Sequence, residues 1–335
     1  MILVTGGTGL VGSHLLYQLS LENNTIRAIY RKNSNLEAVK NVFSYFSDDF
    51  ENLFKKIEWV EADITDVVTL EKAFKNITEV YHSAALVSFN PKDYYKMRKI
   101  NIEGTANIVN FSIENAIKKL CFVSSISAVG KSVNSKFINE SNEWDIEKSN
   151  YGYAISKYGA EIEVWRASQE GVPVVIVNPG VILGAGFWSA GSGKIFSKIY
   201  KGFNLHTKGI TGYVSVNDVV KAMVLLMKSD VKNERFILVA ENKSYQEIFN
   251  EIALKFNKKK PTVKVTRFMS EIGWRLEKVK SVLTNKPPLL TKYSSKSIHK
   301  KRYFSSEKIE NTLDFKFESL SKSISNICKL YIKDI

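Results

Sequence analysis

Tyr153 and Lys157 form a Tyr-x-x-x-Lys spacing that could move a proton. On a helix, positions i and i+4 lie on one face, so the Lys157 ammonium can sit beneath the Tyr153 phenol and favour its phenolate. A nearby cation lowers the pKa of tyrosine from its ordinary value near ~10. Because both residue types are common, one copy of this spacing also fits an ordinary amphipathic helix. The chemistry therefore depends on the elements that would position the pair.

A glycine-rich turn at residues 5–12 could bind a dinucleotide. Residues 1–4 are an apolar run that predicts a buried strand, and residues 14–21 predict a helix after the turn. Glycines let the backbone approach a pyrophosphate, which the free amides at a helix start attract. The strand-turn-helix context favours this function over a purely structural turn. The expected contacts are Gly6, Thr8, Gly9, Leu10, Val11 and Gly12.

The residues after the second predicted strand, 25–30, indicate which dinucleotide binds. An acidic residue at this place would hold the ribose hydroxyls of NAD, but the chain has Tyr30, Arg31 and Lys32. Two cations suit the additional 2′-phosphate of NADP, although they could also be solvated charges. We therefore expect NADP as the cofactor, with NAD as the alternative.

Apolar runs alternate with helix-length segments through the first half of the chain. The strand candidates are residues 57–61, 79–82, 119–124 and 172–178. This alternation predicts right-handed β-α-β crossovers and a doubly wound parallel sheet of the Rossmann type. Ligands bind at the carboxyl ends of such strands. Small or polar residues follow four of the strands, at Asp63 and Ile64, at 82–85, at Ser124 and Ser125, and at 178–180.

The regular alternation ends at Gly180, and a glycine-rich segment, 184–193, follows. We interpret it as a flexible substrate loop in which Phe187 and Trp188 cover a substrate, with a plain connector as the alternative. The remaining elements and domains are also predicted. A helix is expected at 194–200, and a second helix, ending at Lys228, is expected after the stretch 213–218. A last sheet strand is expected at 235–239, with helices after it. The predicted Rossmann domain comprises 1–180 and 213–240, and a smaller, mostly helical substrate lobe comprises 181–212 and 241–335.

The net charge of +14 is concentrated in one segment. Residues 255–302 hold fifteen Lys and Arg against two acids, Glu271 and Glu277. Such a region attracts phosphate-bearing ligands or an anionic lipid surface, or it is a solvated face. Apolar residues recur at helical spacing within it, with basic residues between them, which predicts an amphipathic helix from Phe268 to Leu283. Core packing is the commonest explanation of such a stripe, and contact with a membrane surface is the alternative.

The chain of 335 residues can bury a large core, in one composite domain or two unequal lobes. Its first strand begins at the initiator methionine, and its most apolar stretch, 172–183, is interrupted by polar and glycine residues, so neither a signal peptide nor a membrane span is expected. Cys121 and Cys328 have no metal-ligand spacing. We expect reduced cysteines, no metal site, no nucleic-acid partner and a cytoplasmic protein.

Together these motifs resemble the extended branch of the short-chain dehydrogenase/reductases, the NAD(P)-dependent epimerase/dehydratase group, over essentially the whole chain. Residues 5–12 resemble its cofactor turn, Asp63 its adenine contact, 82–85 its strand-four motif and 101–105 its Asn-x-x-Gly-Thr motif. Tyr153 and Lys157 match its catalytic pair. Ser125 matches its serine, ahead of Ser124 and Ser127, because it lies five residues before Gly130.

The resemblance implies hydride transfer between a nicotinamide and a ketone, aldehyde or secondary alcohol. It implies that Tyr153 gives or takes the hydroxyl proton, that Lys157 lowers the tyrosine pKa and holds the nicotinamide ribose, and that Ser125 hydrogen-bonds the substrate oxygen. Asn101 is expected to support the proton path through water. The further contacts implied are Ile64, Ser83, Ala84, Ala85, Pro179, Gly180 and Val181 for the cofactor, and Val87, Phe187 and Trp188 for the substrate.

Within that branch the chain is more similar to dihydroflavonol reductases and 3β-hydroxysteroid dehydrogenases, through 27–31 and through the tail segments 286–291 and 302–306. Sugar epimerases usually carry an arginine where this chain has Thr211 and Gly212. An NAD-dependent nucleotide-sugar epimerase or dehydratase is therefore the alternative, and a non-catalytic binding protein is less favoured because the Ser, Tyr and Lys set is intact. The family commonly dimerises through helices corresponding to 94–117 and to the one beginning at Tyr151, so a homodimer is expected.

Overall fold

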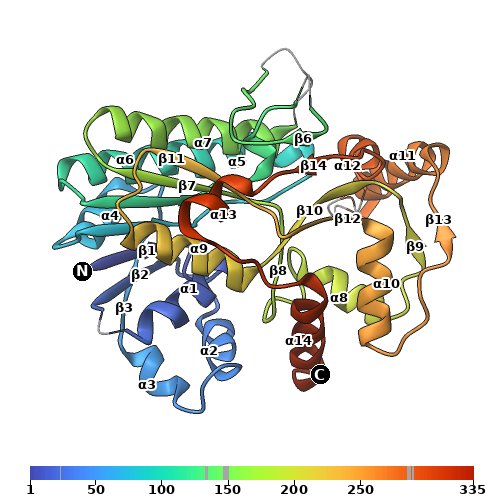
Figure 1. Cartoon of the computed structure of the whole chain (residues 1–335), viewed down its shortest axis with the longest axis horizontal. Coiled ribbons are helices and arrows are strands. Elements are labelled where there is room, and N and C mark those ends of the chain that lie inside the picture. The colour runs from blue at the N-terminus through green and yellow to red at the C-terminus, as the bar shows by residue number, and fades with distance from the viewer. Residues whose placement is uncertain (23, 133–134, 146–150, 285–287, 289) are drawn as a thin grey trace.

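The computed structural model describes residues 1–22, 24–132, 135–145, 151–284, 288 and 290–335. Its centre is a seven-stranded parallel sheet with the order β11-β7-β5-β4-β1-β2-β3 (Figure 1). This is the doubly wound Rossmann arrangement, so the predicted fold class is confirmed. The strands are β1 (Ile2–Thr5), β2 (Ile26–Tyr30), β3 (Ile57–Glu61), β4 (Glu79–His82), β5 (Lys119–Val123), β7 (Val174–Pro179) and β11 (Glu234–Leu238).

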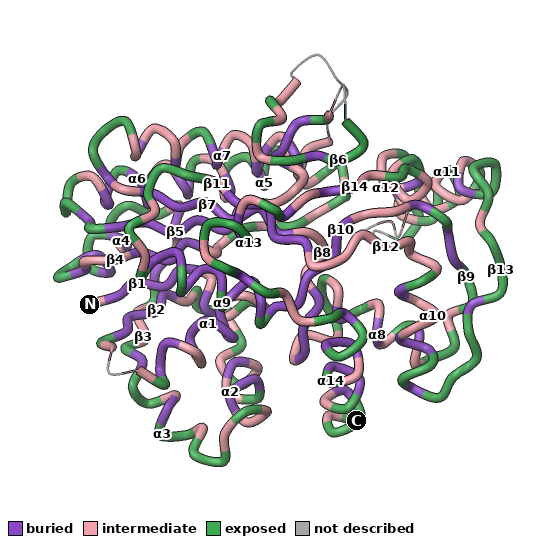
Figure 2. Tube along the Cα trace, in the orientation of Figure 1, coloured by how far each residue is buried: buried purple, intermediate pink, exposed green. Residues whose placement is uncertain are grey.

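Helices cover both faces of this sheet and form two apolar cores (Figure 1). One face carries α1 (Leu10–Ser20), α2 (Leu36–Ser44), α3 (Phe50–Lys55) and α9 (Val216–Lys228), and the other carries α4 (Val67–Phe74), α6 (Gly104–Glu114) and α7 (Gly152–Gln169). Successive strand residues point to opposite faces, so Val4 belongs to the first core and Leu3 to the second. Because both faces are covered, the central strands are buried throughout, as Figure 2 shows in purple.

The segment predicted as one helix over 94–117 is divided. It consists of α5 (Tyr94–Met97), a π-helical stretch Arg98–Glu103 and then α6. Asn101 lies inside the π-helical stretch with its side chain buried. A π turn widens a helix locally and occurs often at functional sites.

A smaller lobe packs beside the carboxyl edge of the sheet around a third apolar core (Figure 1). Its mixed sheet has the order β12-β10-β8, with β8 (Val181–Leu183), β10 (Ile210–Ser215) and β12 (Glu241–Ser244). Its helices are α8 (Gly193–Tyr200), α10 (Tyr245–Lys255), α11 (Arg267–Thr284), α12 (Lys292–Ser297) and α14 (Leu320–Lys333), whereas α13 (Glu307–Leu313) packs on the first core. Two further ladders join β9 (Leu205–His206) to β13 (Val263–Lys264) and β6 (Phe137–Ile138) to β14 (Tyr303–Phe304).

The prediction that the chain after residue 239 is helical throughout is wrong, because β12, β13 and β14 are strands. Each pairs with a segment distant in sequence, so local periodicity carries no signal for it. The chain also returns to the first core after β14, where Ile309 and Phe315 are buried. Of the tail segment 286–291, residues 286, 287 and 289 lie outside the described residues. In the described part of the chain, no helix is long and apolar enough to span a bilayer.

Candidate active site

The glycine turn between β1 and α1 folds against the end of β4. Gly6 has φ of +72°, a left-handed conformation that glycine adopts readily, and a Cβ there would lie 2.6 Å from the Ala84 backbone nitrogen. At Gly12 a Cβ would lie 2.1 Å from the Gly6 carbonyl oxygen. Gly9 caps α1 without a side-chain hydrogen bond, so the helix begins with amides available to a ligand. Leu10 and Val11 are the first two residues of that helix.

Buried side chains connect β1, β4 and the first turn of α6. His82 Nδ1 lies 2.6 Å from Thr5 Oγ1, and its Nε2 lies 2.9 Å from Thr105 Oγ1. The Ser83 hydroxyl donates to the Thr5 carbonyl at 2.8 Å. Desolvation, with Lys157 nearby, lowers the pKa of His82 to about 3, so its ring is neutral. This network fixes the strand-four motif beside the glycine turn.

A cavity of about 350 Å³ lies over the carboxyl ends of β1, β2 and β4. Its lining contains most of the predicted dinucleotide contacts: Gly6, Thr8, Gly9, Tyr30, Arg31, Asp63, Ile64, Ser83, Ala84 and Ala85. Asp63 Oδ1 accepts hydrogen bonds from the Thr65 amide and hydroxyl, both at 2.8 Å, which fixes its carboxylate. The cavity thus lies where the glycine motif predicts a dinucleotide.

Arg31 and Lys32 line the adjoining part of this cleft together with Thr8, Ser34 and Asn35. The turn is ordered by its own hydrogen bonds, because the Arg31 amide donates to Ser34 Oγ at 3.0 Å and the Ser34 amide donates to the Arg31 carbonyl at 2.7 Å. Glu61, Asp63 and Asp66 line the same part of the cleft. Both cations are exposed, so they can reach a ligand group that lies above the turn.

Tyr153 lies in the first turn of α7, beside Ser125 at the end of β5. Desolvation raises the pKa of Tyr153 to about 12, against the opposing effect of a hydrogen bond with the Ser125 side chain. Ser125 Oγ also accepts from the Ser127 amide at 3.1 Å and from the Ser127 hydroxyl at 3.0 Å. The phenol is therefore protonated at neutral pH and is suited to donate a proton.

Lys157 lies one helical turn after Tyr153 and is almost fully buried. Its Nζ donates to the Val123 carbonyl at 2.6 Å and lies 4.5 Å from the centre of the Phe122 ring. Desolvation lowers the pKa of Lys157 to about 7, with Glu161 opposing that shift. The predicted lowering of the tyrosine pKa is not what the structure shows, because burial dominates at Tyr153 and the ammonium is engaged with Val123.

Glu161 is a buried residue of the site that the sequence analysis missed. It accepts from Ser124 Oγ at 2.5 Å, from Asn178 Nδ2 at 2.9 Å and from Arg235 Nη1 at 3.1 Å. These three partners lie at β5, β7 and β11, so one carboxylate joins three neighbouring strands to α7. Its position four residues after Lys157, on the same helix face, was a signal that could have identified it.

Asn101 connects the strand-four motif to the helix that carries Tyr153. Its Oδ1 accepts from the Leu86 amide at 2.7 Å, and its Nδ2 donates to the Leu86 carbonyl at 3.0 Å and to Ser156 Oγ at 2.9 Å. Both amide hydrogens are thus used within the protein. The structure gives Asn101 a positioning role between these two segments.

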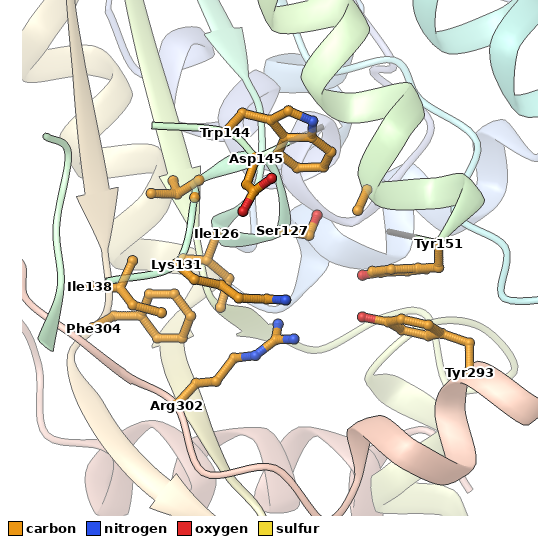
Figure 3. A pocket seen from close by; sticks show the side chains of 13 residues that line it. Ile126, Ser127, Lys131, Ile138, Trp144, Asp145, Tyr151, Tyr293, Arg302 and Phe304 are labelled. Carbon is orange, nitrogen blue, oxygen red and sulfur yellow. The ribbon is translucent and has the colours of Figure 1, made fainter. Parts of the chain in front are cut away.

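A pocket beside Tyr153 is lined by aromatic and basic side chains (Figure 3). The rings of Tyr151 and Tyr293 stack with their centres 3.8 Å apart. Arg302 and Lys131 extend their charged groups toward the space beside this pair, as Figure 3 shows. Ser127 and Ala154 also line the pocket, and in the sequence they closely follow Ser125 and Tyr153. Tyr151, Tyr293, Lys131 and Arg302 had no recognisable signal, because their proximity depends on the long-range fold.

The remaining predicted contacts are more scattered. Trp188 donates from Nε1 to Asp334 Oδ2 at 2.7 Å and packs on Tyr331, so it lies against α14. Phe187 is half-buried in the preceding turn, and neither aromatic lines the pocket beside Tyr151. Val87 is exposed after the strand-four motif. Three others follow β7: Pro179 is its last residue, Gly180 donates its amide to the Leu238 carbonyl, and Val181 begins β8.

Comparison with known proteins agrees with this geometry. The model of the NAD dependent epimerase/dehydratase family matches residues 2–239. The chain belongs to this family. It is an enzyme of the extended short-chain dehydrogenase/reductase type, and the family is NAD(P)-dependent.

Two curated relatives illustrate the range of the family. A putative dihydroflavonol 4-reductase of Synechocystis sp. is 29% identical over 258 residues, covering 75% of this chain and 71% of the relative. A UDP-glucose 4-epimerase of Vibrio cholerae is 28% identical over 272 residues, covering 77% and 76%. Among solved structures, the UDP-glucose 4-epimerase of Thermus thermophilus in complex with NAD has a TM-score of 0.77 at 18% identity, covering 100% of this chain and 99% of that one. That likeness supports the fold.

Proposed function

We propose that this enzyme is an NADP-dependent reductase of a ketone or aldehyde, similar in activity to dihydroflavonol reductases. The observation that carries the proposal is the protonated Tyr153 phenol, hydrogen-bonded with Ser125 at the carboxyl edge of the sheet. A neutral phenol is a proton donor, which favours reduction of a carbonyl over oxidation of an alcohol.

The cleft residues fit a dinucleotide, because glycine at positions 6 and 12 permits backbone approaches that a Cβ would block. Gly6, Gly9 and the first turn of α1 would hold the pyrophosphate, and Asp63 and Ile64 would contact the adenine. Arg31 and Lys32 would pair with a 2′-phosphate, which is the reason for choosing NADP over NAD. When bound, the nicotinamide supplies the hydride.

The chain's own residues then bind the substrate oxygen and transfer a proton to it. Ser125 hydrogen-bonds the carbonyl oxygen, and Tyr153 transfers its phenolic proton to that oxygen as negative charge develops there. Lys157, which donates to the Val123 carbonyl and whose charged form Glu161 favours, would bind the nicotinamide ribose and provide positive charge near the resulting phenolate. Asn101 keeps α7 and the strand-four motif in register.

The side chains around the pocket beside Tyr151 would suit a substrate with a flat apolar part and an anionic group, and the pocket, about 30 Å³ with its tyrosines stacked, must open to admit one. The stacked tyrosines would contact the former, and Lys131 and Arg302 would attract the latter. Tyr293 and Arg302 come from the C-terminal part of the chain, which supports assigning 241–335 to substrate binding. A cytoplasmic location and a homodimer stay predictions.

The pocket cations Lys131 and Arg302 favour one alternative, an NAD-dependent nucleotide-sugar epimerase or dehydratase, because a sugar nucleotide carries a diphosphate. Such an enzyme recycles a tightly held cofactor. Protein purified with one equivalent of NAD, and without net oxidation of added NADPH, would support this alternative over the reductase.

Replacement of Tyr153 by Phe tests the reductase. With NADPH and a panel of aromatic ketones and aldehydes, we expect turnover to fall by at least about a hundredfold, because the proton donor is lost while the ring shape is kept. NADPH affinity, measured by fluorescence titration, should change little. Tyr95→Phe, at an exposed tyrosine, is the matched control. Retention of most turnover in Tyr153→Phe would refute the assignment of the proton donor.

A further inference from the structure

Helix α11 (Arg267–Thr284) presents its apolar side to solvent and its polar side to the protein. Ser270 is the buried residue of the helix, and its hydroxyl lies 2.7 Å from His299 Nε2. Trp274 and Glu277, on the same side, are partly buried. A surface helix of a globular protein normally buries its apolar stripe, so core packing does not explain α11.

Seven exposed apolar side chains define the apolar face of α11. Phe268 is 74% exposed and Leu283 is 80% exposed, although they lie at opposite ends of the helix. At ~100° per residue the seven fall within about 140° of the helix circumference. The members are Phe268, Met269, Ile272, Leu276, Val279, Val282 and Leu283. A continuous apolar face of this length marks a contact with another apolar phase.

Basic side chains lie on both sides of this face. On the helical projection, Arg267 and Lys278 border one side and Lys280 borders the other, while Arg275 falls just inside the arc beside Val282 and pairs with Glu271. Arg267 also lines a groove with five further cations, Lys131, Lys136, Lys300, Lys301 and Arg302. Burial and the neighbouring charges of Arg302, Lys131 and Lys296 lower the pKa of Lys300, which indicates a strongly positive environment.

We propose that α11 docks the protein onto an anionic lipid bilayer, with its apolar face among the acyl chains and its flanking Arg and Lys side chains at the headgroups. An interfacial helix has this combination of an apolar face and a basic border, and both parts contribute to binding. The charge complementarity favours anionic lipid over a second copy of this chain, which would bring the same positive charges together.

The position of α11 connects this contact to the active site. Helices α11 and α12 lie together at the end of the molecule distant from the N-terminus (Figure 1). Helix α12 carries Tyr293, which stacks on Tyr151 in the substrate pocket. The bilayer therefore lies one helix away from the pocket, so a substrate dissolved in lipid has a short path to it.

The experiment is sedimentation of the full chain with phosphatidylcholine vesicles, with and without phosphatidylglycerol. We expect binding to the anionic vesicles, weaker binding to the neutral ones, and a steep loss as salt shortens the Debye length from about 10 Å at 0.1 M to about 3 Å at 1 M. Hydrogen exchange should slow in α11 when anionic vesicles are added.

Two pairs of variants separate the apolar and electrostatic parts. The double variant Leu276→Ser/Leu283→Ser should weaken vesicle binding by about tenfold or more. The double variant Lys278→Glu/Lys280→Glu should weaken vesicle binding by a similar factor. The matched controls are Val68→Ser and Lys72→Glu on α4, where exposed apolar and basic residues lie outside the basic segment. NADPH titration and thermal unfolding verify that every variant is folded.

Absence of binding to both kinds of vesicle would overturn the proposal. Equal binding to neutral and anionic vesicles in 0.1 M salt, or an equal loss in the α4 controls, would also overturn it. A dimer that Leu276→Ser dissociates, with no vesicle binding, would assign the apolar face to a second copy instead.

Discussion

At the scale of single residues, burial has a larger effect on the proton-transfer groups than the charges beside them. Desolvation raises the pKa of Tyr153 to about 12 and lowers that of Lys157 to about 7. The first keeps the phenol protonated, and the second leaves the amine close to its midpoint at neutral pH. Glu161 favours the charged amine, and so it supports the ammonium that a phenolate needs next to it.

Arg31 is expected to distinguish the two dinucleotides. Charge-assisted hydrogen bonds contribute about 1.5–3 kcal/mol, so Arg31→Ala should weaken NADPH binding by about tenfold or more and leave NADH binding nearly unchanged. Fluorescence titration with both cofactors measures this. Lys40→Ala, which removes a half-buried cation on α2, is the control. Equal losses for NADPH and NADH would contradict the assignment of a phosphate contact.

His82 should make the fold sensitive to acid. Its pKa is about 3 in the folded protein against 6.5 for the unfolded chain, so the unfolded state binds more protons between these values. The stabilisation is fully present above pH 6.5 and is lost as the pH falls, by about 1.4 kcal/mol per pH unit. Urea unfolding between pH 5 and 7.5 should show this slope. Burial also lowers the pKa of His14, to about 4, so His14 adds a slope of its own; His82→Gln should therefore reduce the slope by about 1.4 kcal/mol per pH unit, and an unchanged slope in that variant would disprove the contribution.

At the scale of secondary structure, Glu161 joins the ends of β5, β7 and β11 to α7. Glu161→Ala leaves Arg235 partly buried without its carboxylate, which should cost about 3–5 kcal/mol of unfolding free energy. Glu163→Ala is the control on the same helix, because it removes a more exposed ion pair with Arg166 and should cost about 1 kcal/mol or less. Denaturant unfolding measures both. Similar losses in the two variants would contradict the joining role.

The elements that the sequence predicted correctly are those with a local signal. Ile57–Glu61 and Glu79–His82 appear with the predicted bounds; the second is a largely buried central strand, and the first is an edge strand in which Ile57 is the buried residue. The π-helical stretch around Asn101 and the two-residue strands β13 and β14 depend on distant partners, so no local pattern indicates them. In the site, Tyr153 and Lys157 share one helix, whereas Tyr293 and Arg302 reach the pocket only through tertiary folding.

At the scale of the whole molecule, the C-terminal part of the chain packs in the cores of both lobes. Ile309 and Phe315 pack in the core of the large sheet, while Ile324 and Tyr331 of α14 pack in the core of the smaller lobe. Trp188 and Tyr45 both donate hydrogen bonds to Asp334, near the end of the chain. These contacts connect the lobes, so the chain that follows the pocket residues Tyr293 and Arg302 is fixed in both cores.

A second subunit is expected at the surface formed by α6 and α7. Helices α6 and α7 pack side by side, and Ile162 is 46% exposed on α7. We predict that light scattering at micromolar concentration gives twice the chain mass of 38.0 kDa. Ile162→Arg should produce a monomer, because a charge would then be buried in the interface. Ile332→Arg, at a similarly exposed isoleucine on α14, should leave the dimer intact.

The two surfaces can be distinguished in one set of measurements. If the dimer forms through α6 and α7, then Leu276→Ser on α11 should not change the mass, and Ile162→Arg should not abolish vesicle binding by the monomer. A strictly monomeric native protein would remove the dimer prediction and leave the catalytic assignments unaffected. A dimer that survives Ile162→Arg but dissociates in Leu276→Ser would place the interface on α11, against both this prediction and the proposed lipid contact.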